Sequence, residues 1–210
     1  MIRTCLFDMG NVLVFFSHDR MCEQLGDLCG RSADEMRRLL FDSGVQWNYE
    51  RGWLSPEQFH DWFQTTTGCS TPIADLNRAG ADIFWLNAPI VPVLDRLKEL
   101  GLRLVLLSNT CLTHFEWIRD HFDVLQRFDR FVTSCGAGAI KPEPAIYTAA
   151  LREIGCRPEE CFYTDDIPSY VAAGREHGLR AELFTDVPAL LKQLQGCGVP
   201  LFGAGFQFAS

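Results

Sequence analysis

The sequence predicts an α/β protein in which helices cover both faces of a parallel sheet of about five strands. The main observation is that short apolar runs alternate with segments of helical periodicity along most of the chain. Such alternation is typical of βαβ units, whose right-handed crossovers gather the strands into one sheet. The second observation is length, because 210 residues suffice for one compact domain with an insertion but are few for two full domains.

The apolar runs define the elements of this doubly wound, Rossmann-like sheet. The predicted strands are residues 4–7, 103–107, 131–134, 161–164 and 180–184. The helices predicted to cover the sheet include residues 91–100, 144–154 and 187–194. Each strand after the first is preceded by a helix-like segment, as a parallel sheet requires.

One interval is too long for a simple crossover. Roughly 90 residues separate the first predicted strand from the second, whereas a crossover needs about a dozen. We therefore predict a helical cap at residues 19–87, inserted into a core made of residues 1–18 and 88–210. No role is predicted for the glycine-rich, aromatic tail at 196–210.

The insertion carries clear signals for helix starts. Ser32 with Glu35 and Ser55 with Gln58 are typical of capping boxes, and Pro56 occupies the favoured first helical position. Four of the five tryptophans also lie here: Trp47, Trp53, Trp62 and Trp85. We expect these tryptophans to form the small core of the cap and not the wall of a substrate site.

The composition argues against several classes of partner. The formal net charge is −8 and the pI about 5.1, so the field of the molecule would repel nucleic acid. We expect no membrane partner, because no apolar stretch approaches the roughly 20 residues of a membrane span and no signal peptide is visible. The nine cysteines form no CxxC pair and are odd in number, which disfavours a disulfide framework and favours a cytoplasmic location.

Asp8 directly follows the first apolar run. Its carboxylate is therefore expected at the carboxyl edge of the sheet, where open α/β sheets bind ligands and where it could act as a nucleophile. Gly10 follows two residues later and offers no side chain for proton transfer.

Polar residues also follow the later runs. Ser108 and Asn109 offer a hydroxyl and backbone N–H groups suited to phosphate oxygens, although either could instead cap the next helix. Lys141 precedes Pro142, which restricts its backbone and would aim the ammonium at one place. The alternative for this lysine is a solvated surface charge.

Asp165 and Asp166 stand side by side at the end of the fourth run. Adjacent carboxylates repel each other unless a cation lies beside them, so the pair predicts a metal site. Oxygen-only ligands and a phosphate substrate favour Mg²⁺. The alternative is an exposed turn or a helix cap.

Four motifs in chain order resemble those of the haloacid dehalogenase (HAD) superfamily of phosphohydrolases: FDMGNVL, LLSNT, IKPEPAIY and YTDDIPSYVAAG. The order of all four makes the resemblance specific, and it spans the whole predicted core. The insertion, with YERGWLSPEQF inside it, is similar to the helical cap of one HAD subfamily. That subfamily contains α-glucose-1-phosphate phosphatases and the amino-terminal domain of soluble epoxide hydrolase.

The resemblance implies Mg²⁺-dependent hydrolysis of a small phosphorylated metabolite through an aspartyl phosphate on Asp8, with Lys141 as the second catalytic residue. The implied metal ligands are Asp8, the carbonyl of Gly10, Asp165 and Asp166. The implied substrate contacts are Gly10, Asn11, Ser108, Asn109 and Lys141.

Gly10 departs from the family's pattern, since most HAD phosphatases carry an aspartate there as general acid and base. Losing such a group typically costs about 10² to 10⁴ in rate. The loss matters least for an acidic leaving group, such as that of a sugar 1-phosphate, and the α-glucose-1-phosphate phosphatases also look to carry Asp-x-Gly-Asn. His18 or Asp19 could substitute as the acid, or could be hinge residues of the cap.

Two other functions stay open. A 2-haloacid dehalogenase also uses an aspartate nucleophile without a second carboxylate, although that chemistry needs no metal pair such as Asp165 and Asp166. A non-catalytic HAD-fold binding protein would also keep the fold. Within the cap, Asn48, Glu50 and Arg51 are candidates for substrate selection, with a surface role equally open.

Overall fold

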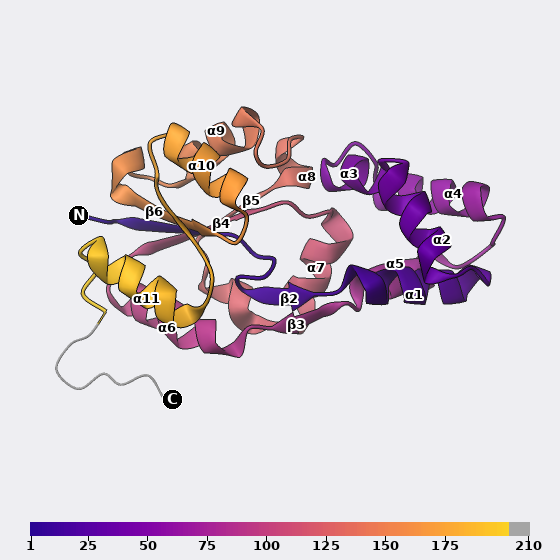
Figure 1. Cartoon of the computed structure of the whole chain (residues 1–210), viewed down its shortest axis with the longest axis horizontal. Coiled ribbons are helices and arrows are strands. Elements are labelled where there is room, and N and C mark those ends of the chain that lie inside the picture. Colours follow the sequence, from indigo (N-terminus) through magenta and orange to yellow (C-terminus); the bar gives the residue numbers. More distant parts are fainter. Residues whose placement is uncertain (202–210) are drawn as a thin grey trace.

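The structure, a computed structural model, describes residues 1–201, and most of the glycine-rich tail therefore lies outside the described residues. It contains a parallel sheet in the order β5-β4-β1-β6-β7 (Figure 1). The strands are β1 (Thr4–Phe7), β4 (Arg103–Ser108), β5 (Arg130–Thr133), β6 (Cys161–Asp165) and β7 (Arg180–Leu183). The predicted doubly wound α/β fold is confirmed, and each predicted strand is found with ends that differ by at most one residue.

Helices cover both faces of this sheet (Figure 1). One face packs against α6 (Val91–Glu99), α7 (Leu112–His121) and α11 (Val187–Gly196). The other face packs against α9 (Pro144–Glu153) and α10 (Pro168–Glu176). Alternation along β1 explains the two cores, because Cys5 and Phe7 belong to the first while Leu6 belongs to the second.

Shorter elements connect these helices and strands. They are η2 (Ala88–Ile90), η3 (Asp123–Arg127), α8 (Ser134–Ala137) and η4 (Pro158–Glu160). Ser134 begins α8, so the sequence prediction that it ends a strand is wrong by one residue. The physical reason is that the Thr133 side chain accepts from the Gly136 N–H and caps a helical turn at this point.

The segment between β1 and β4 carries a separate group of helices, seen beside the sheet in Figure 1. These are α1 (His18–Cys29), α2 (Ala33–Arg37), η1 (Arg38–Asp42), α3 (Val45–Glu50), α4 (Pro56–Thr67) and α5 (Ile73–Ala81). Both predicted capping boxes are confirmed, at Ser32 and at Ser55. A short antiparallel ribbon of β2 (Val14–Phe16) and β3 (Phe84–Leu86), which was not predicted, flanks the helices at both ends.

The expectation that the tryptophans form the core of the insertion is wrong for three of the four. Trp47, Trp53 and Trp85 are 42%, 63% and 50% exposed, and only Trp62 packs against the buried cluster. Smaller side chains fill this cluster instead, among them Met21, Leu25, Met36, Leu40, Phe63 and Leu76. Trp85 faces outward because it alternates along β3 with Phe84 and Leu86, which lie against the cores.

Two expectations drawn from composition can also be compared with the structure. All nine cysteines are free, so the prediction of no disulfide framework is confirmed. Among residues 1–201, none of the helices combines the length and the apolar character that crossing a membrane requires.

Candidate active site

The polar residues predicted at the strand ends meet at the carboxyl edge of the sheet. Because β1 lies between β4 and β6, the residues that follow these three parallel strands are neighbours. They surround a cavity of about 190 Å³, which we call the carboxyl-edge cavity. The predicted site residues that line it are Asp8, Gly10, Asn11, Ser108, Asn109, Lys141 and Asp166.

Lys141 forms the centre of the charged floor. Its side chain is 1% exposed, and its Nζ donates to Asp8 Oδ1 at 2.7 Å and to Asp165 Oδ2 at 2.6 Å. A third bond joins Nζ to the carbonyl of Leu107 at 3.1 Å. Burial alone would lower the pKa of Lys141, but the two carboxylates raise it above its ordinary value. The lysine is therefore a buried, fixed cation and not a solvated surface charge.

Asp8 is almost buried beside this lysine. Burial raises the pKa of Asp8 to about 7, and the charge of Asp165 adds to the rise while Lys141 opposes it. The backbone N–H of Asp8 donates to the carbonyl of Thr164 at 3.0 Å, which ties the first turn after β1 to the neighbouring strand β6. The carboxylate is thus held at a fixed position against the cavity.

The two adjacent aspartates have different surroundings. Asp165 is fully buried: its Oδ2 accepts from Lys141 and, at 2.6 Å, from the Tyr163 hydroxyl, and its Oδ1 accepts from the Ile167 N–H at 2.9 Å. Asp166 instead lines the cavity and accepts from Asn11 Nδ2 at 3.0 Å. Burial raises the pKa of Asp166, which is the effect that a bound cation would reverse.

These residues suit a divalent cation. One carboxylate oxygen from each of Asp8, Asp165 and Asp166 can be chosen so that all three lie within 4.8 Å of one another. When ionised, the three carboxylates carry one negative charge each and Lys141 carries one positive charge, so a divalent cation would balance the group. An all-oxygen donor set is the one that Mg²⁺ prefers. Since hydrogen bonds occupy both oxygens of Asp165, Asp8 and Asp166 are the better placed direct ligands.

Asn109 has a role that the sequence did not predict. Its side-chain Oδ1 accepts from the backbone N–H of Lys141 at 2.7 Å, and its Nδ2 donates to the Lys141 carbonyl at 3.2 Å. The carboxamide therefore holds the backbone of the lysine from both sides, and Nδ2 also contacts the Tyr170 hydroxyl at 3.3 Å. Ser108 is buried at the same strand end and lines the cavity.

The structure distinguishes His18 from Asp19, the two residues that the sequence offered as a substitute acid. His18 lines the cavity, whereas Asp19 is exposed and pairs with Arg37. The His18 ring lies between Phe16 and Phe41, with ring centroids 4.9 Å and 5.0 Å away, and burial lowers its pKa. Asp19 is therefore placed away from the reacting centre.

The three candidates for substrate selection also differ. Glu50 lines the cavity, and its carboxylate accepts from Gln46 Nε2 at 3.0 Å. Asn48 is not among the lining residues, and Arg51 forms an ion pair with Glu143 at 2.5 Å. Glu50 is thus the one of the three that faces the site.

Polar contacts join the end of α3 to the core, and the sequence did not predict them. Ser134 Oγ donates to the Glu50 carbonyl at 2.5 Å and accepts from the Thr110 N–H at 2.8 Å. The Tyr49 and Thr113 hydroxyls are hydrogen-bonded to each other. Together with the ion pair between Arg51 and Glu143, these contacts join the end of α3 to the segments that follow β4 and β5.

Phe16 occupies the space beside Gly10. A Cβ atom added at Gly10 would lie 2.9 Å from Phe16 Cε1, closer than side chains normally pack. Position 10 therefore lacks a carboxylate and also lacks the room for one while the ring stays in place. Phe16 also lines the cavity, so an aromatic ring borders it beside position 10.

Comparisons with known proteins find similarity to hydrolases. The family of haloacid dehalogenase-like hydrolases matches residues 2–178. Phosphatase MT3486 of Mycobacterium tuberculosis is 25% identical over 224 residues, which cover 97% of this chain and 99% of that protein. A magnesium complex of the HAD family enzyme BT-2542 from Bacteroides thetaiotaomicron superposes with a TM-score of 0.78 at 25% identity, covering 91% of this chain and 98% of that one.

A further relative is larger than this chain. Bifunctional epoxide hydrolase 2 of Rattus norvegicus is 30% identical over 120 residues, or 52% of this chain. The matched part is 21% of that relative, so the chain corresponds to about a fifth of its length.

Proposed function

Because the chain belongs to the haloacid dehalogenase-like hydrolase family, we propose that it hydrolyses a small phosphate monoester through a phosphorylated Asp8. The observation that carries the proposal is the buried contact of Lys141 with both Asp8 and Asp165 at the floor of the carboxyl-edge cavity. A carboxylate fixed beside a permanent cation is suited to in-line attack on phosphorus. Phosphatase MT3486 and the other hydrolases named above support the reaction class.

In this proposal the carboxylate of Asp8 attacks the phosphorus, and the bond from phosphorus to the ester oxygen breaks. The leaving oxygen departs with the electron pair of that bond. Water then attacks the phosphorus of the aspartyl phosphate, which releases inorganic phosphate and restores Asp8. Lys141 favours the ionised form of Asp8 and holds it in place, and Asn109 positions Lys141 through its backbone. Ser108 and the N–H of Asn109 would bind the phosphoryl oxygens.

Mg²⁺ is the proposed cofactor. Asp8, Asp166 and the carbonyl of Gly10 would hold it, and Asp165 would act chiefly through Lys141. When bound, it would supply positive charge to a substrate that the acidic protein would otherwise repel. The magnesium complex of BT-2542 supports this assignment.

Residues 19–87 would form a cap that closes the cavity. The support is that His18, Trp47 and Glu50 line the cavity together with residues from the sheet. The absence of a carboxylate at Gly10 would restrict the reaction to leaving groups that depart with little protonation, of which a sugar 1-phosphate is one.

The test is phosphate release from a panel of phosphate monoesters, measured with Mg²⁺ and with EDTA. We expect Mg²⁺-dependent turnover that disappears in Asp8→Asn. Chloride release from 2-haloacids in EDTA would favour the dehalogenase alternative instead. Binding of phosphate esters without any turnover would favour the non-catalytic alternative, which Gly10 leaves open.

A further inference from the structure

Part of the lining of the carboxyl-edge cavity is apolar. This apolar wall comprises Phe16, Trp47, Ile83, Phe84 and Ile167. An apolar wall of this kind stabilises a bound group roughly in proportion to the apolar surface that it covers. A polyol placed there would lose water from hydroxyl groups that the wall cannot bond.

The charges of the cavity also limit the substrate. Lys141 is the one lysine or arginine among residues 1–201 that lines the cavity, and its ammonium already contacts two carboxylates. Glu50 also lines the cavity, where burial raises the pKa of its carboxyl group, and it offers no positive charge to a second acidic group on the substrate. The substrate is therefore expected to carry a single phosphate and no further anion.

The two histidines that line the cavity are poorly placed to protonate a leaving oxygen. His18 lies between the rings of Phe16 and Phe41, and His114 Nε2 is 3.0 Å from the Gly80 carbonyl. Position 10 is a glycine whose neighbouring space is filled by Phe16. A leaving group that is stable as an anion is thus favoured over an ordinary alcohol.

We propose that the leaving group is a single aromatic ring, so that the substrate is an aryl phosphate. This inference rests on the proposed phosphatase function and narrows its substrate class. The volume limits the leaving group to one ring, since a dry apolar cavity of about 150 Å³ holds benzene and the carboxyl-edge cavity, which must also hold the phosphate, measures about 190 Å³. The ring lies against Phe16 and Trp47, and the phosphate lies on the charged floor.

The reaction balances without a general acid. The carboxylate of Asp8 forms a bond to phosphorus, and the phosphorus–oxygen bond to the ring breaks. The ring leaves as a phenolate, which takes a proton from solvent water. Water then cleaves the aspartyl phosphate, giving inorganic phosphate and free Asp8.

The inference combines two properties of the substrate, an apolar ring and an acidic leaving group. Four substrates of similar size separate them. Phenyl phosphate is apolar with an acidic leaving group, and cyclohexyl phosphate is apolar with a poor one. Glucose 1-phosphate and glucose 6-phosphate are the corresponding polar pair. Steady-state kinetics with Mg²⁺ should give KM values about 10- to 100-fold lower for the two apolar esters, because each buries a ring. The kcat of phenyl phosphate should exceed that of cyclohexyl phosphate by about 10²-fold or more.

A pair of variants tests the wall directly. Trp47→Ala should raise the KM for phenyl phosphate about tenfold and leave the KM for glucose 1-phosphate within about twofold. Trp53→Ala is the matched control, because Trp53 is equally part of the insertion and exposed but does not line the cavity. It should change neither value. Thermal unfolding of both variants would verify that they remain folded.

The outcomes distinguish the inference from the function on which it rests. If glucose 1-phosphate has the higher kcat/KM, the aryl phosphate inference is overturned while the phosphatase function stands. Equal kcat values for phenyl and cyclohexyl phosphate would reveal an efficient general acid and would also overturn it. If none of the four esters is hydrolysed, both proposals fail.

Discussion

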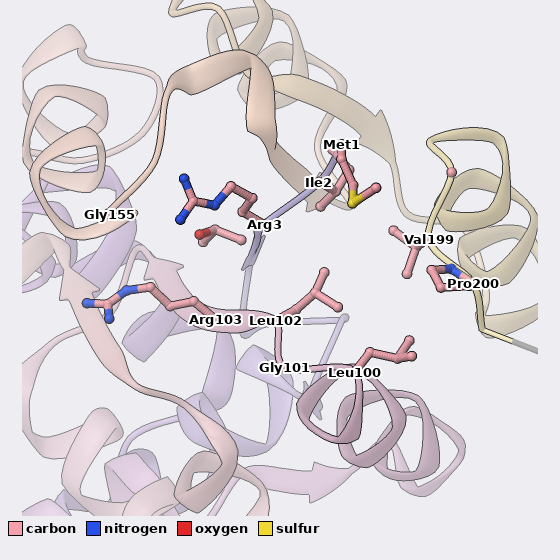
Figure 2. A pocket seen from close by; sticks show the side chains of 12 residues that line it. Met1, Ile2, Arg3, Leu100, Gly101, Leu102, Arg103, Gly155, Val199 and Pro200 are labelled. Carbon is pink, nitrogen blue, oxygen red and sulfur yellow. The ribbon is translucent and has the colours of Figure 1, made fainter.

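Two hollows at opposite edges of the same sheet differ in how their charges are arranged. The pocket at the amino edge is the larger, at about 390 Å³, and its lining joins the first residues of the chain to the residues just before β4 (Figure 2). We call it the amino-edge pocket. Arg3 and Arg103 line it with mostly apolar neighbours, and none of its lining residues among 1–201 is a carboxylate. The carboxyl-edge cavity is about half as large. At its floor the carboxylates of Asp8, Asp165 and Asp166 lie close together, with one lysine beside them.

The difference indicates that the direction of the strands, and not the volume of a pocket, determines where charged side chains come together. Figure 2 shows the guanidinium groups of Arg3 and Arg103 extending in the same direction, away from Val199 and Pro200. No opposite charge meets them in that pocket. At the carboxyl edge the charged groups face one another and are buried, so each depends on its partners.

The largest expected contrast is in activity. Asp8→Asn should lower phosphate release by at least ~10³-fold, because it removes the nucleophile that the proposal requires. Arg3→Ala, at the amino-edge pocket, should leave the rate within about twofold, since ligands of such sheets bind at the other edge. Assays of both proteins on the same phosphate ester measure the contrast. A large loss in Arg3→Ala would show that the two edges are coupled.

The next contrast is in stability. Lys141→Met should lower the free energy of unfolding by about 3 to 5 kcal/mol, because it leaves Asp8 and Asp165 buried without their cation. Lys98→Met is the control: Lys98 pairs with Asp129 at a partly exposed site, where the loss should stay under about 1 kcal/mol. Urea unfolding in EDTA measures both. If both variants lost the same free energy of unfolding, the buried ion pairs of Lys141 would contribute no more to stability than the partly exposed pair of Lys98.

A third prediction concerns acid stability. Burial lowers the pKa of His114 to about 4, against an ordinary value of 6.5, with His18 adding to the fall and the Gly80 carbonyl opposing it. Between these pH values the unfolded chain binds the proton more tightly, so stability falls as the pH drops from 6.5 towards 4. The loss from this residue reaches about 3 kcal/mol near pH 4.

His114→Gln isolates this effect, because glutamine can keep the bond to the Gly80 carbonyl but does not titrate. The difference between the unfolding free energies of the two proteins should change across this pH range and be constant above it. Parallel pH profiles would contradict the assigned burial of the imidazole.

The smallest contrast compares two glycines. Gly10→Ala should lower the free energy of unfolding by about 1 kcal/mol, because the added methyl group meets the ring of Phe16. Gly80→Ala, inside α5 with no atom within 4 Å of the added carbon, should raise it by up to about 1 kcal/mol. Both changes can be read from denaturant midpoints. A neutral effect at Gly10 would show that Phe16 moves freely and that the space for a side chain exists.

The sequence was sufficient to predict the sheet and the meeting of its strand ends. Asp8 and Asp165 lie at the ends of apolar runs that become the neighbouring strands β1 and β6, and parallel topology brings such positions together. Lys141 reaches them from the loop between α8 and α9, which topology alone does not place. The two hydrogen bonds between the Asn109 carboxamide and the Lys141 backbone could not be predicted, because they depend on how two loops distant in sequence pack.

The insertion was predicted less well for a different physical reason. Capping boxes are local, so Ser32 and Ser55 were recognisable, but the orientation of short helices depends on tertiary packing. The ribbon of β2 and β3 has three residues per strand, too few for a periodic signal, yet it places Phe16 beside Gly10. The exposed position of Trp47 follows from the same packing.

The contacts of α3 with the core have a consequence for the energetics of binding. Ser134, Arg51 and Tyr49 hold the end of this helix in one place before any ligand arrives. The conformational entropy of placing the helix that carries Trp47 is therefore lost when the chain folds and not when a ligand binds. A pocket prepared in this way favours selectivity between ligands of different shape over adaptation to many of them.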